Sequence, residues 1–268
     1  MISRRCFLST LGASVAAAEE TRTRSATVTK LFRSPDGHPN ALESAREGLW
    51  VGEQTTDRAY LLDWRTGKVL KSVETESSNT SGIAYGGGFL WMAANGKAIG
   101  RAARPTDATR GEIVKVDPEN GKTVARYPVP DGGGVHGIVY VDGTLWMTCF
   151  KWNALCQVEA KDFRVLRKIP VHLSRAHGLA WDPPGIWVMH SNDYVIQKLD
   201  AASGALLEQI RLAQGKDPDP HGMDLHEGRL YYCDAGIAPG GVSTNSAGAG
   251  WICRVEERVS RNHSKRQA

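Results

Sequence analysis

Short apolar segments alternate with glycine- and aspartate-rich turns along most of the chain. Between residues 82 and 130, four such segments follow one another, at 82–86, 89–94, 112–117 and 122–129. Each has the length of a strand, and none shows the 3.6-residue period of an amphipathic helix. The pattern therefore predicts four antiparallel strands in succession.

This unit of four strands recurs along the chain. Its first segment carries a small or polar residue at a shared place, which we call the rim position: Asn40, Ser81, His136, His177 and His221. An aromatic residue follows ten places later: Trp50, Trp91, Trp146, Trp187 and Tyr231. Four strands repeated every ~40–45 residues are typical of a β-propeller blade. A β-sandwich, the competing all-β fold, would not produce five superposable copies.

The turn after the third segment of each unit gives an independent count. It begins with an acidic residue in all units: Asp63, Asp117, Glu159, Asp200 and Glu256. An acid followed by glycine or another polar residue is typical of a tight hairpin turn. The turns therefore count five units without reference to the rim positions.

The last unit lacks a fourth segment, because the chain after Glu256 is basic and polar. A segment at 26–32 resembles the fourth segments of the other units, and we expect it to be the outermost strand of the last blade. Such pairing would close the ring and remove two exposed sheet edges. The predicted fold is all-β, a five-bladed β-propeller over residues 25–257 with four antiparallel strands per blade.

Composition agrees with a globular repeat protein, since 41% of the 268 residues are hydrophobic. The net charge of +4 comes from the two ends of the chain, so the body is about neutral and a nucleic-acid surface is not expected. Residues 258–268 are predicted to be a basic, disordered tail. We expect a monomer.

The first 18 residues have the features of an export signal. The sequence at 3–8 resembles a twin-arginine motif, a short apolar stretch follows, and Ala16 to Ala18 provide a small-residue cleavage site. The alternative is an ordinary N-terminal helix. The apolar stretch is too short to span a membrane, which takes ~20 residues. The signal predicts a bacterial protein that is periplasmic or secreted.

Four cysteines follow the export signal, and none forms a C-x-x-C motif. Cys149 and Cys156 lie in neighbouring predicted strands, and Cys233 and Cys253 occupy nearly the same places two units later. An oxidising compartment permits both pairs to form disulfides. The alternative is four small buried thiols.

Propeller topology places the chemically distinctive residues together. The start of each first strand lies on the same rim as the end of the second strand, and the second-strand ends carry Glu53, Ala94, Cys149, His190 and Asp234. The long insertions at 95–111 and 235–250 leave from this rim too, and the second is glycine-rich enough to act as a lid. We therefore expect the functional site here, with His38 close by.

Several kinds of chemistry fit these side chains. His136, His177 and His221 could bind a divalent metal (Mg, Ca or Zn), with carboxylates as further ligands or as partners that orient the imidazoles. Alternatively, His177 or His221 could act as a general base. The set proposed for catalysis is His221, Asp234, His190 and Glu53. The competing structural interpretation is that these histidines only bond neighbouring blades and recur because the unit was duplicated.

A second constellation is a carboxyl pair. Glu43 and Asp224 share another place in the repeat, in blades that become neighbours when the ring closes. Such a pair could hold a cation or share a proton.

Some segments resemble known propeller families. The sequence at 82–101 resembles the repeat of the virginiamycin B (streptogramin) lyases, and that at 112–130 resembles YVTN-type repeats of quinoprotein-like periplasmic propellers. The sequence at 220–223 resembles NHL-type propellers, including an amidating lyase whose channel zinc is held by inner-strand histidines.

The lyase resemblance implies a histidine at a first-strand start that acts with an acid at the following second-strand end, aided by magnesium. His221 with Asp234 matches that order, with aspartate in place of glutamate. Those lyases have seven blades, whereas five are counted here. Five is the number in glutaminyl cyclotransferase propellers, whose characteristic motifs are not found in this sequence.

The sequence thus predicts an exported propeller enzyme, a metal-assisted lyase or hydrolase that acts on a small molecule at the histidine-bearing rim. The alternative is a non-catalytic periplasmic propeller that binds a small ligand or a protein partner on the same rim. Metal analysis and ligand-induced stabilisation without turnover are the observations that separate the two.

Overall fold

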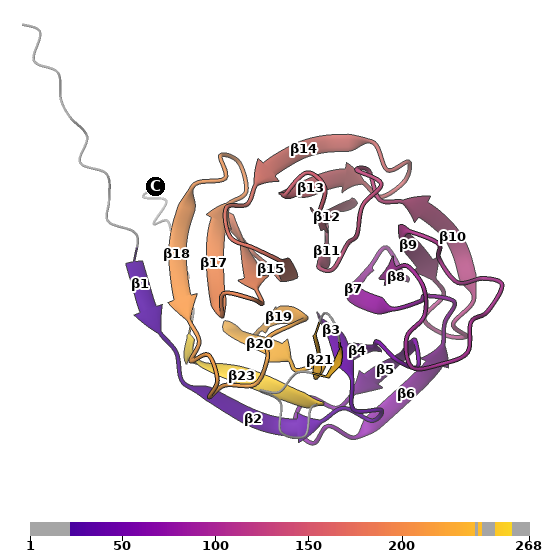
Figure 1. The fold of residues 1–268 in the computed structure, drawn as a ribbon, viewed down its shortest axis with the longest axis horizontal. Coiled ribbons are helices and arrows are strands. Elements are labelled where there is room, and N and C mark those ends of the chain that lie inside the picture. Colours follow the sequence, from indigo (N-terminus) through magenta and orange to yellow (C-terminus); the bar gives the residue numbers. More distant parts are fainter. Residues whose placement is uncertain (1–21, 239–240, 243–249, 259–268) are drawn as a thin grey trace, which may run out of the picture.

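Five four-stranded blades surround a central channel in the computed structural model (Figure 1), which describes residues 22–238, 241–242 and 250–258. Blade one is β3 (Pro39–Ala45), β4 (Gly48–Glu53), β5 (Arg58–Leu62) and β6 (Val69–Glu74). Blade two is β7 (Thr80–Gly86), β8 (Phe89–Asn95), β9 (Gly111–Val116) and β10 (Thr123–Pro128). Blade three is β11 (Ile138–Val141), β12 (Thr144–Cys149), β13 (Ala154–Glu159) and β14 (Val165–Pro170). The predicted propeller fold is confirmed.

The remaining blades contain strands from both ends of the chain. Blade four is β15 (Ala176–Asp182), β16 (Gly185–His190), β17 (Val195–Asp200) and β18 (Leu206–Arg211). Blade five is β19 (Met223–His226), β20 (Arg229–Cys233), β23 (Trp251–Arg258) and β2 (Val28–Arg33). β2 pairs antiparallel with β23, so that Val28 faces Val255. The predicted closure of the ring by an N-terminal strand is thus confirmed.

The sequence did not predict β1 (Arg22–Ser25), which adds a parallel fifth strand to blade four by pairing with β18. Arg24 Nη2 lies 3.1 Å from Glu208 Oε2, and both side chains are largely buried. The chain then crosses to β2 in blade five, so its N-terminal part joins two blades. β1 also covers a sheet edge that would otherwise be open.

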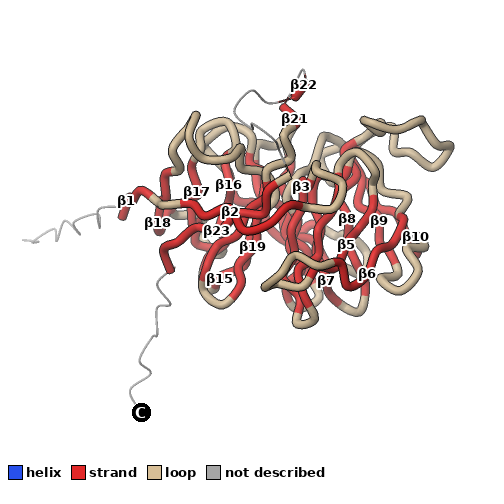
Figure 2. Tube along the Cα trace, turned by 90° about the horizontal axis from the view of Figure 1, so that it is seen from below, coloured by secondary structure: helices blue, strands red, loops and turns tan. Residues whose placement is uncertain are grey.

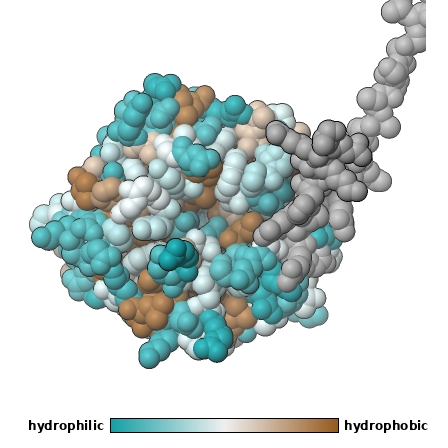
Figure 3. Space-filling model, turned by 180° about the vertical axis from the view of Figure 1, so that it is seen from behind, coloured by the Kyte–Doolittle hydropathy of each residue, from teal (hydrophilic) through white to brown (hydrophobic). Residues whose placement is uncertain are grey.

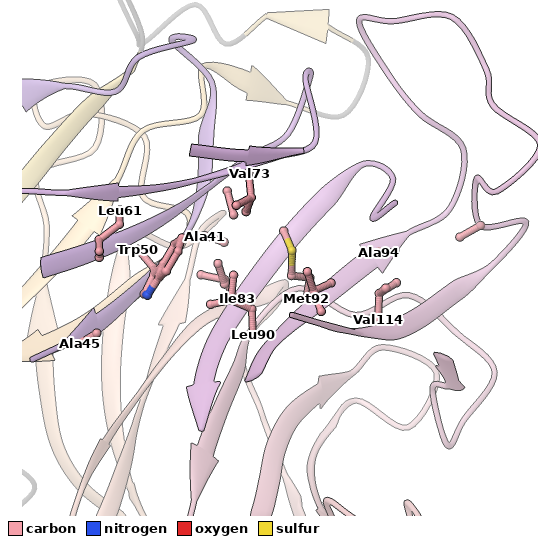
Figure 4. Close-up of a cluster of buried hydrophobic side chains, with 13 residues drawn as sticks. Ala41, Ala45, Trp50, Leu61, Val73, Ile83, Leu90, Met92, Ala94 and Val114 are labelled. Carbon is pink, nitrogen blue, oxygen red and sulfur yellow. The ribbon is translucent and has the colours of Figure 1, made fainter. Parts of the chain in front are cut away.

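Apolar side chains fill the space between blades. The tryptophans of the second strands are nearly inaccessible, with Trp50 at 4% and Trp187 at 0% exposure. Figure 4 shows one such layer, in which Trp50 of blade one lies near Ile83 and Met92 of blade two. The interpretation of these tryptophans as packing residues is confirmed, and burying each large apolar side chain stabilises the ring by about 1.5–3 kcal/mol.

Glycine after the rim position allows the inner strands of neighbouring blades to touch. A Cβ on Gly82 would overlap the carbonyl oxygen of His136, and one on Gly137 would overlap that of His177. Gly178 packs likewise against the backbone at His221 and Met223. The His-Gly pattern therefore reflects backbone contact between blades, which sets the imidazoles in adjacent places on the rim.

Two connections project from the same face. β21 (Ile237–Ala238) and β22 (Gly241–Val242) form a short hairpin in the insertion after β20, and Figure 2 shows it above the ring on the same side as the long loop between β8 and β9. The opposite face, seen in Figure 3, is mostly hydrophilic with small separate hydrophobic areas. Part of the insertion predicted to act as a lid lies outside the described residues.

The cysteines separate into two different arrangements, and all four are buried free thiols. Cys156 faces Met147 across β12 and β13, which puts it on the same side of the sheet as Cys149. Cys253 faces Tyr232, whereas Cys233 faces Ile252, so these two thiols point to opposite sides of blade five. A Cys233–Cys253 disulfide would need one strand to turn over.

The predicted export signal at 1–18 and the predicted tail beyond Arg258 lie outside the described residues. Within the described part of the chain, no helix is long and apolar enough to cross a membrane.

Candidate active site

The three rim histidines form a contiguous row at the starts of the inner strands of blades three, four and five. His177 lies in β15, and His136 and His221 lie just before β11 and β19. The ring centroids of His136 and His177 are 4.2 Å apart and those of His177 and His221 are 5.0 Å apart, both edge-to-face. Their exposed fractions are 7%, 0% and 3%. The row is therefore a packed, largely dry array of imidazoles beside the channel mouth.

His136 is oriented by a residue that the sequence did not single out. Asn95, at the end of β8, accepts a hydrogen bond from Val135 N through Oδ1 (3.2 Å), which fixes the direction of its amide. Its Nδ2 then donates to His136 Nε2 (2.9 Å). A neutral His136 consequently carries its proton on Nδ1, and that nitrogen has no hydrogen-bond partner among the described residues.

His177 occupies the centre of the row and is completely buried. Among the described residues, neither of its ring nitrogens has a hydrogen-bond partner. Burial lowers the pKa of His177 well below its usual range, and the neighbouring His136, His221 and Arg175 act in the same direction. The pKa of His136 is lowered in the same way, first by burial and then by Arg175. Both imidazoles are therefore neutral at pH 7.

The remaining site residues from the sequence lie around this row. His221 Nδ1 is 3.2 Å from Asp219 O and 3.5 Å from Ala235 N. His190 is separate from the row: it lies on β16 opposite Ala176, and its Nδ1 is 3.3 Å from Ser174 O. His190 therefore holds the loop before β15 in place.

Glu53 lies where blades one and five meet and is fully buried. It accepts hydrogen bonds from the Ser34 hydroxyl and from His38 N (2.9 Å), while His38 Nδ1 is 2.8 Å from Ala235 O. Burial raises the pKa of Glu53 to about 7, although the hydrogen bonds from Ser34 and His38 oppose the shift. Through His38, Glu53 thus connects the start of blade one to the residue that follows Asp234.

Asp234 also lies at the end of β20 and is 1% exposed. Its Oδ1 accepts a hydrogen bond from Gly236 N (2.9 Å). The two remaining rim positions, Asn40 and Ser81, carry no histidine and contact each other. Asn40 Nδ2 donates to Thr80 O (3.1 Å) and lies 3.3 Å from Ser81 Oγ.

Glu43 and Asp224 are brought together as the repeat suggested. Asp224 accepts a hydrogen bond from Ser44 N, and burial raises its pKa to about 7. The pKa of Glu43 is raised well above its usual range, first by burial and then by the negative charge of Asp224. The pair therefore retains a proton near neutral pH.

The three histidines contact one another instead of surrounding a shared point. No group of three or more His, Cys, Asp or Glu side chains in the described part of the chain is arranged to hold a metal ion. As they stand, these side chains do not fit a three-ligand metal centre, and binding would need the rings to turn. The assignment of a metal to His136, His177 and His221 stays a prediction.

A cleft of about 280 Å³ lies between blades three and four beside the histidine row. Phe150 lines it, and its ring centroid is 4.5 Å from that of His136. Arg175, two residues before His177, lines it too. Sequence reasoning missed this arginine. The places two residues before the other rim positions carry His38, Asn79, Gly134 and Asp219, so the charge at this place varies between units, and that variation could have drawn attention to it.

No protein-family model and no curated protein matches this sequence. Among solved structures, glutaminyl cyclase of Myxococcus xanthus is similar, with a TM-score of 0.66 and 13% identity over 90% of this chain and 100% of that one. Virginiamycin B lyase of Staphylococcus aureus matches with a TM-score of 0.49 and 17% identity over 85% of this chain and 69% of that one. At 13% identity the likeness to the glutaminyl cyclase is one of fold alone.

Proposed function

We propose that the histidine-bearing rim is the active site of a lyase or hydrolase that acts on a small molecule, with the substrate bound in the cleft between blades three and four. The observation that carries the proposal is the contact between Phe150 of the cleft and His136 of the histidine row. A cleft beside titratable groups with shifted pKa values is the usual form of a catalytic pocket. We further propose export to the bacterial envelope, on the basis of the N-terminal motif.

His136 is the proposed catalytic residue. Asn95 occupies its Nε2, so the buried Nδ1–H, which has no hydrogen-bond partner among the described residues, is the group we propose to meet a substrate oxygen. A neutral imidazole N–H can stabilise negative charge that develops on that oxygen through a hydrogen bond, without transfer of its proton. His177, whose ring packs edge-to-face against that of His136, holds the His136 ring in position. His221 extends the row from the other side, with Asp234 and Glu53 holding the surrounding loops.

The test is a hydrolase and lyase screen with His136→Gln beside the wild type. Glutamine keeps polar groups but has no rigid ring that accepts from Asn95 at one nitrogen and donates from the other, so we expect kcat to fall by about 10²–10³-fold. His172→Gln is the matched control, because His172 is exposed and lies outside the row. Equal turnover by His136→Gln and wild type would rule out the catalytic role.

The metal prediction has its own test. Purified protein would be analysed for bound Mg, Ca and Zn, and His177→Ala compared with the wild type. If the rings turn to hold a metal, the wild type contains about one equivalent and the variant loses it, since each imidazole supplies an essential ligand. Equal, negligible metal in both proteins would leave a metal-free imidazole mechanism.

A second candidate function is supported by the near-complete burial of the row. His177 has no exposed surface, which is what a purely structural array would show. A non-catalytic propeller that binds a small ligand in the same cleft would be stabilised by that ligand without turning it over.

A further inference from the structure

The backbone of Arg175 adopts a left-handed conformation. It is the last residue before β15 and has a positive φ of 45°, a conformation that costs a residue with a Cβ roughly 1–2 kcal/mol. Its side chain is half-buried and lines the cleft beside the histidine row. The fold thus maintains an unfavourable backbone conformation at the point where the guanidinium enters the cleft.

The donors of Arg175 are unused. Among the described residues, its guanidinium makes no hydrogen bond and no salt bridge, in contrast to Arg101, which pairs with Asp57 and Asp107, and to Arg126, which pairs with two glutamates. Burial lowers the pKa of Arg175 and the carboxylate of Asp219 opposes the shift. The open donors of this half-buried guanidinium are therefore available to acceptors of a ligand that enters the cleft.

The surroundings select the charge and shape of that ligand. The cleft walls include Phe150 and Val171 and contain no carboxylate, and the adjoining imidazoles are neutral. Arg175 is therefore the source of formal charge in the lining. One planar guanidinium against an apolar wall suits a single carboxylate, which it can bind through two parallel hydrogen bonds. A phosphate dianion would need further positive charge, which the described residues of the lining do not supply.

We propose that the ligand of this cleft is a small molecule with one carboxylate, bound by Arg175, with its apolar part against Phe150 and its reacting group toward His136. The placement of a reacting group beside His136 rests on the proposed function, whereas the binding of a carboxylate by Arg175 does not. Arg175 is a binding residue, and its donors fix which end of the ligand lies beside the histidine row.

The test uses benzoate as the probe, with neutral benzamide and inorganic phosphate as comparisons, and measures binding to the full chain by calorimetry and thermal shift. We expect benzoate to bind in the millimolar range or tighter, and benzamide and phosphate to bind at least ~10-fold more weakly. That ratio corresponds to about 1.4 kcal/mol.

Variants connect the binding to Arg175. Arg175→Asn removes the charge while tolerating the positive φ, and it should abolish benzoate binding. Arg175→Lys should weaken it about 10-fold, because a single ammonium cannot replace the two parallel hydrogen bonds. If the asparagine variant does not fold, the lysine variant decides. Arg164→Gln is the control, since Arg164 is exposed in a turn of blade three, and it should bind as the wild type does.

Equal binding of benzoate and benzamide, unchanged binding by the Arg175 variants, or no binding of benzoate would each overturn the carboxylate site. The two proposals can fail separately. Benzoate binding through Arg175 with no effect of His136→Gln on any turnover would leave the binding site and remove the enzyme. Turnover that needs His136 but is equally fast on neutral substrates would support the enzyme and remove the carboxylate site.

Discussion

Gly137→Ala is expected to destabilise the propeller by about 2–3 kcal/mol. The added Cβ would overlap the carbonyl oxygen of His177 in the next blade, and neither backbone can move without disturbing an inner strand. Overpacking of this kind typically costs about 1–3 kcal/mol, and a backbone neighbour places this site at the upper end. The free energy of unfolding, measured by denaturant titration, checks the value.

Gly88→Ala is the matched control for this prediction. Gly88 has φ +82° and nothing within 4 Å of its Cβ position, so alanine there suffers only the left-handed conformation, at about 1 kcal/mol. If both variants lost the same stability, the contact between inner strands would not be the reason for glycine after the rim position. Gly137→Ala should also weaken any ligand binding in the cleft, because it displaces the histidine row.

Glu53→Gln is expected to change how stability depends on pH. The pKa of Glu53 is about 7 in the folded protein and ~4.3 in an unfolded chain. Such a raised carboxyl pKa favours folding fully below pH ~4.3, and this contribution is lost as the pH rises to about 7. With 1.36 kcal/mol for each pKa unit, the complete loss is roughly 4 kcal/mol, of which roughly 3 kcal/mol falls between pH 4.5 and 7.5. Glutamine does not titrate and keeps an acceptor for His38 N, so the variant should lack this loss.

Other groups act on the same pH range with the opposite sign. The pKa values of His136 and His177 are lowered on folding, so their contribution is present above pH ~6.5 and is lost as the pH falls. The raw curve of the wild type therefore combines both trends. The difference between variant and wild type isolates Glu53: relative to wild type, Glu53→Gln should gain roughly 3 kcal/mol between pH 4.5 and 7.5. A constant difference across that interval would mean that Glu53 has an ordinary pKa.

The repeat made the fold predictable. Hydrophobic alternation and the acidic turns gave the number of blades, and the similarity of residues 26–32 to other fourth strands gave the closure by β2. β1 could not be found in this way, because its four residues are polar and it pairs in parallel outside the repeat. Local pattern carries no information on such a pairing.

The site was predictable only in part, for the same reason. Register within the repeat placed His136, His177 and His221 side by side, which is where the rings lie. Asn95 and Arg175 depart from the unit, and their roles depend on which side chain they meet in the next blade. His190 shares the rim in sequence yet points to a loop carbonyl, because strand position fixes the rim but not the direction of a side chain.

The pairing of β2 with β23 has a consequence for the order of folding. Val28 pairs with Val255, so blade five is incomplete until residue 255 has been synthesised. Blades one to four can form in succession as they emerge from the ribosome, but the last contacts are also the most distant in sequence. Premature release of the chain would leave β2 without its partner and one blade with an open edge. Ring closure is therefore expected to be a late step of folding, which needs both β2 and β23.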